Sequence, residues 1–564
     1  MPRTFFLLSG LVSFACVMGA QPVISPDGVL NAASNIPTGL PNSGIAQGAM
    51  FVVYGSNLGP AQLRLAGSLP LLTSLGGASV SVTSGALTRP AFLVYASATQ
   101  VAAVLPSTMP VGDATVTVSY GGQASLPARI QIVRSAFGIF TRNQGGTGPG
   151  ITQNWVSPTT IPTTNSLIDA AAPGQVEILW GTGLGPISGD DSSAPAVGNL
   201  DADVEVLIGG RSARLLYKGR SPEFPGLDQV QFEVPAGVQG CYVPVAVRTE
   251  SKYSNYATMA IASNGRYCAN AVSFTSTELQ SLEAAGAVRV GIINLNHVII
   301  MAAGFPDQSS IEEGRANFYR RDLNEALSAL SPAEDWWTAP LLAEPGSCMV
   351  YSYRTSNEAG DFTPIDPIRS AGLKAGSALG VSGPKGTKQI PLRNPALTSF
   401  KTTLGGSAAN MPDYLDPGDY VVNNGSGGVD VPGFRANLRI PAGLVWTNRD
   451  AIRSIQRATG LTLTWSAADP ESELVTIAGV SVRTDSKVRA SFICSELASA
   501  GRFTVPAGVL ASLPASSPSS GVVTEPSTGM LMLGASRPSR FTPAGIDIGI
   551  ISYSTGTFLM VPFQ

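Results

Sequence analysis

Charged side chains are scarce in this chain of 564 residues. Asp, Glu, Lys and Arg together make up 13% of it, against about 25% in ordinary soluble domains. The formal net charge is −3, so no strong positive field attracts nucleic acid or anionic lipid. We therefore expect no nucleic-acid partner. Disordered chains combine high charge with low hydrophobicity, and this sequence, with 44% hydrophobic residues, meets neither condition.

Histidine is nearly absent, because His297 is the single one in the chain. A catalytic site of the Ser-His-Asp or Cys-His kind would have to use it. Its neighbours Asn296 and Val298 lie in a strand-like pattern without a nucleophile elbow. We interpret His297 as an ordinary surface or strand-edge residue and expect no catalytic residue, no cofactor and no metal site. A hydrolase with an unrecognised site within residues 266–564 stays open as an alternative.

Long hydrophobic runs are missing from the interior of the chain. The best candidate, residues 284–305, contains Arg289 and His297 among other polar residues, which are costly in lipid, so we expect no transmembrane span. The N-terminus differs, because Arg3 precedes an almost wholly apolar run and Met18-Gly-Ala20 is a small-residue ending. We predict a signal peptide at residues 1–20. The protein is then secreted, extracellular or at the cell surface, with the periplasm as an alternative.

Cysteine is sparse as well. Removal of the signal peptide takes Cys16 with it and leaves an even number, which in an exported chain indicates two disulfides. No two cysteines lie at metal-binding spacing. Cys241 opens the last strand region of a repeated unit and Cys268 follows its end, whereas Cys348 and Cys494 lie in strand patterns further on. We predict that Cys241 pairs with Cys268 and that Cys348 pairs with Cys494.

Glycine and proline, in contrast, are abundant, with 62 and 42 residues. Short apolar runs separated by Gly and Pro are typical of many short β-strands joined by turns. The stretch from Gly48 to Pro60 is an apolar run that ends at Tyr54, followed by a glycine turn and Leu-Gly-Pro. It returns from Gly174 to Pro186, with Trp180 in the place of Tyr54. We expect both aromatic residues to fill the space between two sheets.

Further motifs repeat in the same order, with Gln100–Pro106 returning as Gln229–Pro235. A repeat of about 125 residues is a duplicated domain, since solenoid units are shorter. The ordered set resembles the tandem immunoglobulin-like IPT/TIG-type modules of uncharacterised secreted acidobacterial proteins, from about Leu30 to Ser263. The resemblance implies a pair of immunoglobulin-like β-sandwiches in an exported protein, and it assigns no catalytic residue.

The second half mixes strand patterns with two helix signals. Thr275-x-x-Glu278 is a capping box before a short helix, and Ser310-x-x-Glu313 opens a second candidate. We predict an all-β, multidomain chain of tandem Ig-like sandwiches with a mostly β C-terminal half and one or two short helices. The expected domains are residues 21–137 and 138–265 (Ig-like), 266–441 (mostly β with short helices) and 442–564 (a C-terminal β-sandwich).

Two groups of residues are weak candidates for binding. Acidic residues in turns offer hard oxygen ligands for Ca²⁺, but no calcium-loop pattern is present, so we interpret them as solvated; they are Asp190, Asp191, Asp201 and Asp203. The adjacent Trp336 and Trp337 can stack on sugars, or one can pack in a core while the other covers a domain junction.

The sequence favours a non-catalytic secreted or cell-surface protein in adhesion, matrix or structural interaction. Its partners are unknown, with surface proteins or polysaccharide as the classes to test. The alternative is a carbohydrate-binding or enzyme-accessory protein.

Overall fold

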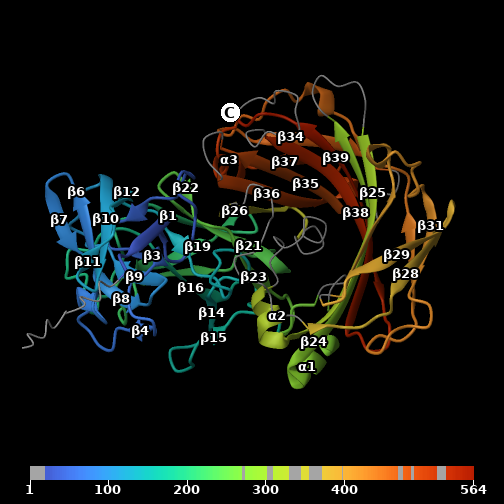
Figure 1. The fold of residues 1–564 in the computed structure, drawn as a ribbon. Helices are drawn as coiled ribbons and strands as arrows, with labels where there is room; N and C mark the ends of the chain where they lie inside the picture. The colour runs from blue at the N-terminus through green and yellow to red at the C-terminus, as the bar shows by residue number, and fades with distance from the viewer. Residues whose placement is uncertain are drawn as a thin grey trace, which may run out of the picture.

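The structure is a computed structural model, and it confirms an all-β, multidomain chain (Figure 1). It describes residues 20–564 except 270–273, 302–308, 330–343, 355–370, 397, 468–473, 484–487 and 517–528. The pair Trp336-Trp337 and nearly all of the predicted signal peptide therefore lie outside the described residues. The helices in the described part are α1 (Ser276–Ala285), α2 (Leu323–Ala329) and α3 (Ala507–Ala511), with single 3₁₀ turns at η3 (Ser407–Ala409), η4 (Arg449–Ala451) and η5 (Ala498–Ala500).

Two sheets within residues 23–133 pack face to face and form the first sandwich. One sheet contains, in spatial order, β1 (Val23–Asn31), β3 (Met50–Ser56), β9 (Gln100–Val104), β8 (Phe92–Ala96) and β4 (Arg64–Leu65). The other contains β2 (Ile45–Ala46), β12 (Ala128–Val133), β10 (Gly112–Tyr120), β6 (Ala78–Ser84) and β5 (Ser74–Leu75), with β11 (Gln123–Ala124) on β10 and β7 (Leu87–Pro90) on β6. This strand order is that of an immunoglobulin-like sandwich, in which strands A, B, E and D face strands C, F and G.

The second sandwich repeats this plan within residues 138–261. Its first sheet contains β15 (Thr163–Thr164), β14 (Thr152–Trp155), β16 (Val176–Thr182), β20 (Asp228–Glu233) and β19 (Arg214–Arg220), with β13 (Gly138–Ile139) on β16. Its second sheet contains β18 (Arg211–Ser212), β17 (Val204–Ile208), β21 (Gly240–Thr249) and β22 (Lys252–Tyr253), with β23 (Ala257–Ile261) on β21. The repeated stretch recognised in the sequence is β3 in the first copy and β16 in the second.

The expectation that Tyr54 and Trp180 fill the two cores is wrong. Side chains alternate along a strand, and the cores take Phe51 and Val53 from β3 and Leu179 from β16. Tyr54 and Trp180 therefore face the other side of their sheets, and each is only partly buried. Their polar atoms bond there: Tyr54 Oη donates to Asn35 Oδ1 (3.1 Å), and Trp180 Nε1 donates to Gln153 Oε1 (2.8 Å).

A 13-stranded sheet dominates the described part of the second half (Figure 1, yellow-green to red). In spatial order it contains β26 (Ser347–Arg354), β36 (Val488–Leu497), β35 (Leu474–Val482), β38 (Met530–Phe541), β39 (Ile548–Met560), β24 (Ala287–Met301), β25 (Ser309–Asp322), β30 (Ser399–Gly405), β29 (Gly386–Asn394), β28 (Ala378–Gly383), β31 (Gly418–Asn423) and β32 (Arg435–Ile440), with β27 (Ala371–Gly372) on β25. A small sheet of β33 (Val445–Trp446), β34 (Leu461–Ser466) and β37 (Arg502–Val505) packs beside it.

This sheet differs from the expected division of the second half into residues 266–441 and 442–564. Strands from both ranges pair in it, with β36, β35, β38 and β39 of the second range inserted between β26 and β24 of the first. Strand β24 runs parallel to β39 over twelve registered pairs, from Val290 to Met301. The sheet also curls, so that β32 lies against β38 and β39. Phe434 and Phe541 meet across the enclosed core, with ring centroids 5.1 Å apart.

One predicted helix is present and the other is not. Helix α1 has the full capping box of Thr275 and Glu278, and Gly286 ends it in the left-handed conformation. The helix expected to open at Ser310 is wrong, because Ser309–Asp322 is strand β25. Long-range pairing with β24 on one side and β30 on the other outweighs the local helix signal. A helix forms only after the strand, in α2.

Both predicted disulfides are confirmed. Cys241 of β21 bonds to Cys268 just beyond β23, and Cys348 of β26 bonds to Cys494 directly opposite on β36. The second half packs on both sandwiches through one core, which contains Leu40 from the first and Tyr256 from the second. No helix in the described part of the chain has the length and apolar character required to cross a membrane.

Candidate functional site

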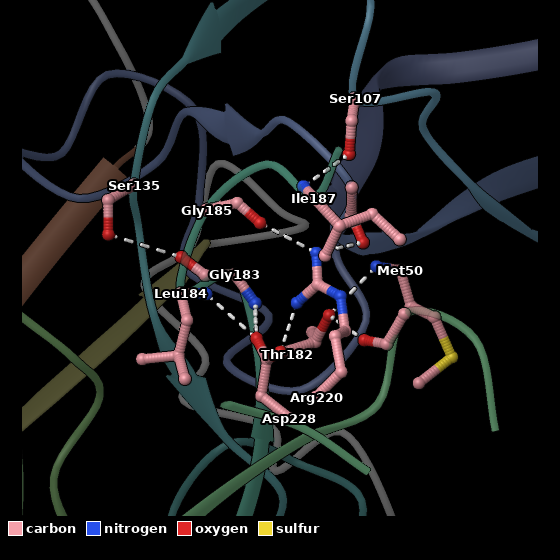
Figure 2. Close-up of polar contacts among 12 residues, drawn as sticks. Met50, Ser107, Ser135, Thr182, Gly183, Leu184, Gly185, Ile187, Arg220 and Asp228 are labelled. Atoms are coloured by element: carbon pink, nitrogen blue, oxygen red, sulfur yellow. Dashed lines mark hydrogen bonds and ion pairs between the residues drawn. The ribbon is translucent and has the colours of Figure 1, made fainter. Parts of the chain in front are cut away.

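The most elaborate polar arrangement in the described residues lies where the two sandwiches meet, and Arg220 is at its centre (Figure 2). Arg220 is the last residue of β19, and the antiparallel register places it directly opposite Asp228, the first residue of β20. The two side chains form an ion pair through Nη1 and Oδ1, and their exposed fractions are 1% and 0%. A buried charge is tolerated only when it is paired and hydrogen-bonded, and both conditions hold here.

The Asp228 carboxylate is satisfied from the other side by backbone. The amides of Gly183 (2.6 Å) and Leu184 (2.7 Å) both donate to Oδ2, so the turn that follows β16 wraps around this oxygen. Burial acts to raise the pKa of Asp228, while the Arg220 guanidinium and these backbone donors oppose the rise. The Gly-Leu-Gly-Pro turn of the second repeat is therefore held by an acid that comes from a neighbouring strand.

Arg220 also reaches out of its own sandwich into the first one. Its Nη2 donates to the carbonyl oxygen of Gly185 (2.7 Å) and to that of Gly48 (2.8 Å), which begins the first copy of the repeat. Gly48 has a φ of 72°, and a Cβ at this position would overlap the Arg220 guanidinium. Glycine is required there for both its backbone conformation and its lack of a side chain.

A second bridge between the sandwiches joins Asp191 to Ser107. The Ser107 amide donates to Asp191 Oδ2 (2.6 Å) and its hydroxyl donates to Oδ1 (2.7 Å). The Ile187 amide in turn donates to Ser107 Oγ (3.0 Å). Asp191 is only 6% exposed, and burial raises its pKa while the Ser107 bonds lower it. The interpretation of Asp191 as a solvated turn residue is therefore wrong.

The other acids considered for calcium go to separate partners. Asp190 accepts hydrogen bonds from Ser193 and Ser192 within its own turn, which lower its pKa. Asp201 pairs with Arg134 at 2.8 Å, and Asp203 lies 3.5 Å from Arg248. Each of these three acids therefore has its own partner, and in the described part of the chain they do not form a shared cation site.

A third bridge uses Thr182 at the end of β16. Its hydroxyl donates to the Gly226 carbonyl oxygen (2.6 Å) and accepts a hydrogen bond from the Met50 amide (2.8 Å). Met50 begins β3, so the two copies of the repeated strand are tied to each other directly. Asn31 adds to this link, because its Nδ2 donates to the Ala136 carbonyl oxygen (3.2 Å) between the sandwiches.

Sequence reasoning missed Arg220, Asp228 and Ser107. One signal was available in the comparison of the two copies. Tyr54 pairs with Gln100 in the first and Trp180 pairs with Gln229 in the second, so Thr99 occupies the place of Asp228. An acid that is present in only one copy of a duplicated domain points to a contact that only that copy makes.

A cavity of about 530 Å³ lies between the first sandwich and the C-terminal half. Its lining includes Thr38 and Ser43 on one side and Arg457 and Arg483 on the other. Arg457 is partly buried and its Nη1 donates to the Leu513 carbonyl oxygen (2.8 Å), while no carboxylate among the described residues pairs with it. Burial lowers its pKa. The cavity thus contains two guanidinium groups beside neutral polar groups.

No family model and no curated protein matches the sequence. Among solved structures, domains 5–6 of the S-layer protein SbsC are similar over 43% of this chain and 100% of that one, at 14% identity with a TM-score of 0.16. The immunoglobulin domains 1–4 of Sidekick-1 match over 95% and 99%, at 13% identity and 0.12. The FN1–FN3 domains of chicken CNTN1 match over 74% and 98%, at 8% identity and 0.11. Likeness at these TM-scores carries no argument, and the immunoglobulin-like assignment depends on the strand order itself.

Proposed function

We propose that this protein is an exported, non-catalytic structural or adhesion protein, in which the two Ig-like sandwiches act as one rigid arm carried on the C-terminal half. The observation that carries the proposal is the bond from Arg220 to the Gly48 carbonyl oxygen. Arg220 and Asp228 both belong to the second sandwich, so separation of the modules would break the charge-assisted bond from Arg220 to Gly48. Bonds of this kind are stronger than neutral ones, and the link therefore opposes bending at the junction. Rigid arms suit proteins that bear load or present a surface at a distance.

Further features support the finer points of the proposal. Two disulfides are typical of proteins made for an oxidising compartment, and the apolar N-terminal run supports export through a signal peptide at residues 1–20. We assign the sandwiches to the IPT/TIG type, with boundaries at 21–137 and 138–265, on the repeated motif order. The partner class we favour is a protein or polysaccharide of the cell envelope.

A binding assay tests this proposal. The purified chain is incubated with cell envelopes and with isolated envelope polysaccharide, and the retained fraction is measured after sedimentation. We expect saturable retention by the envelope. A general glycosidase and esterase screen runs in parallel, and turnover together with no retention would overturn the proposal in favour of a hydrolase within residues 266–564.

Polysaccharide binding is a second candidate, favoured by the cavity that Arg457 lines. Guanidinium groups bind carboxylates through paired hydrogen bonds, so the matching ligand is an acidic polysaccharide. Trp336 and Trp337 stay a separate proposal for sugar stacking.

The test compares binding of a polyuronate with binding of neutral dextran. Arg457→Ala should abolish polyuronate binding, and the control Arg89→Ala, at an exposed position of β7, should not. Equal binding by both variants would reject the cavity.

A further inference from the structure

The only histidine of the chain lies beside a fully buried carboxylate in the large sheet. His297 on β24 and Glu312 on β25 are directly opposite each other in the antiparallel register, so their side chains share one face. Nδ1 of His297 lies 4.0 Å from Oε1 of Glu312, and the two side chains are 20% and 0% exposed. Among the described residues, His297 is the only basic side chain within 4.0 Å of the Glu312 carboxylate.

The next strand leaves room for the Glu312 carboxylate. Gly405 of β30 is the partner of Glu312 on its other side, and a Cβ on Gly405 would overlap Oε2. In place of a side chain, residues 412–415 fold over this position. The amides of Tyr414 and Leu415 donate to Oε2 and Oε1 of Glu312, the second at 3.0 Å. The loop is thus organised around one buried acid.

The same loop supplies a third donor. Asp413 precedes these two amides in the chain, and its carboxylate, the His297 ring nitrogen and the Glu312 carboxylate all have ligand atoms within 4.8 Å of one another. Ser310 Oγ donates to Asp413 Oδ1 (3.0 Å), which orients it. Lys385 Nζ donates to the Asp413 carbonyl oxygen (2.6 Å) and pairs with Asp416 (2.8 Å), so it holds the loop from outside.

We propose that His297, Glu312 and Asp413 form a binding site for a divalent transition-metal ion, with Zn²⁺ as the best match. One imidazole and two carboxylates are a donor set that Zn²⁺ takes, with a fourth position for water, whereas Ca²⁺ prefers an all-oxygen set. A cation here neutralises a buried carboxylate whose hydrogen bonds come from two backbone amides, since the Lys385 amine that feels its charge is paired with Asp416 instead, and burial of a charge without a close counter-ion is costly. Small rotations of the Asp413 and His297 side chains would bring the three ligand atoms to one ion, because Asp413 is exposed and His297 is partly exposed.

The zinc site does not depend on the proposed binding to the cell envelope. A metal would tie β24 and β25 to the 412–415 loop. The open fourth position would also let a donor from a partner complete the site. The two proposals fail independently, because zinc binding is measured on the isolated chain.

The test uses the full chain, purified without a histidine tag and treated with EDTA. Titration with ZnCl₂ is followed by calorimetry, and we expect one tight site per chain. His297→Ala should weaken zinc binding by at least about tenfold, as loss of even an outer-shell partner does in known sites. Asp419→Asn is the matched control, because it removes a carboxylate from an exposed ion pair with Arg439 on the same sheet.

A second measurement separates this site from chance binding elsewhere. Because the chain has one histidine, ¹³C-labelled histidine gives one imidazole signal in the NMR spectrum, and zinc should shift it at one equivalent. Asp413→Asn, a change at an exposed residue, should need more zinc for the same shift. Zinc that binds without moving this signal, or that binds His297→Ala as tightly as the unchanged chain, overturns the proposal.

Discussion

The guanidinium of Arg220 donates a hydrogen bond to the carbonyl oxygen of Gly48, 172 residues earlier in the chain. The bond joins the two copies of one duplicated module, yet the two residues have different places in their copies. Gly48 precedes β3, whereas Arg220 ends β19 and is paired with Asp228. The junction therefore uses a charge pair from the second copy and a backbone oxygen from the first.

The first prediction concerns this junction. Arg220→Met keeps much of the side-chain volume but leaves the Asp228 carboxylate buried without its charge partner. Removal of one partner from a buried pair typically costs about 3–5 kcal/mol, so we expect the variant to lose that much free energy of unfolding in the sandwiches. Urea unfolding followed by tryptophan fluorescence measures it. The angle between the sandwiches should also vary more, which small-angle X-ray scattering reports as a larger radius of gyration.

The control for this prediction is an ion pair of the same kind on the surface. Arg214 pairs with Glu233 across the same two strands, but the Arg214 side chain is 71% exposed. Arg214→Met should change stability and scattering little, because exposed pairs contribute little. Equal effects of the two variants would contradict the role given to burial at Arg220.

The second prediction compares neighbours on β16. Leu179 is fully buried in the core of the second sandwich, whereas Trp180 is on the opposite face. Leu179→Ala should cost about 2–5 kcal/mol, the range for a buried leucine. Trp180→Ala should cost clearly less, because much of the ring is outside the core and the main loss is its bond to Gln153. Urea unfolding of both variants measures the two losses of unfolding free energy. A larger loss for Trp180→Ala than for Leu179→Ala would show that Trp180 packs in the core.

The alternation of side chains along a strand explains why the repeated strands could be predicted and their core residues could not. The repeated stretch identified β3 and β16, and the order of motifs predicted a duplicated sandwich. The side chain that faces the core, however, depends on which face of the strand the partner sheet covers. An aromatic residue such as Trp180 gives no information on that face, and the fully buried neighbours Phe51 and Leu179 were equally apolar candidates.

The junction and the cluster around His297 were harder to predict for a different reason. Both depend on contacts between residues far apart in sequence, such as Ser107 with Asp191 and Glu312 with Leu415. Strand order decides those contacts, and a sheet that places β39 beside β24 cannot be read from local patterns. Cysteine pairing was predictable, because the even count left after removal of the predicted signal peptide and the strand positions of Cys348 and Cys494 limited the choices.

The third prediction ranks the two disulfides. The cysteines of the first bond, Cys241 and Cys268, are 27 residues apart, and those of the second, Cys348 and Cys494, are 146 apart. Closure of the longer loop removes more entropy from the unfolded chain, by about 1.5 kcal/mol in the chain-entropy model. Replacement of both cysteines of a pair by Ser should therefore destabilise the chain more for the second pair. Urea unfolding of the two double variants tests the ranking, and the reverse order would contradict it.

The fourth prediction starts from a buried acid that the junction does not use. Glu177 of β16 is on the same strand face as Leu179, and its exposed fraction is 0%. Neither carboxylate oxygen has a hydrogen-bond partner among the described residues. Burial, together with the smaller effect of the nearby Asp169 carboxylate, raises the pKa of Glu177 to about 8. Glu177 is thus protonated in the folded chain at neutral pH.

A raised pKa makes stability depend on pH with a definite sign. The folded chain holds this proton up to about pH 8, whereas the unfolded chain releases it near its ordinary value of 4.5. Between these values the folded state binds more protons, so the free energy of unfolding falls as pH rises, by about 1.4 kcal/mol per pH unit. Below pH 4.5 nothing is lost, and above pH 8 the loss is complete.

Glu177→Gln removes this titration while keeping the shape of the side chain. We expect the variant to gain stability relative to the unchanged chain as pH rises from 5 to 8, and to differ little at pH 4. Urea unfolding at each pH, followed by tryptophan fluorescence, to which Trp155 and Trp180 of the same sandwich contribute, gives the difference. Glu233→Gln, on the neighbouring strand β20 and partly exposed, is the control and should show no such trend. A difference between Glu177→Gln and the unchanged chain that stays constant from pH 5 to pH 8 would mean that Glu177 is ionised inside the sandwich, and that a cation or ordered water satisfies it there.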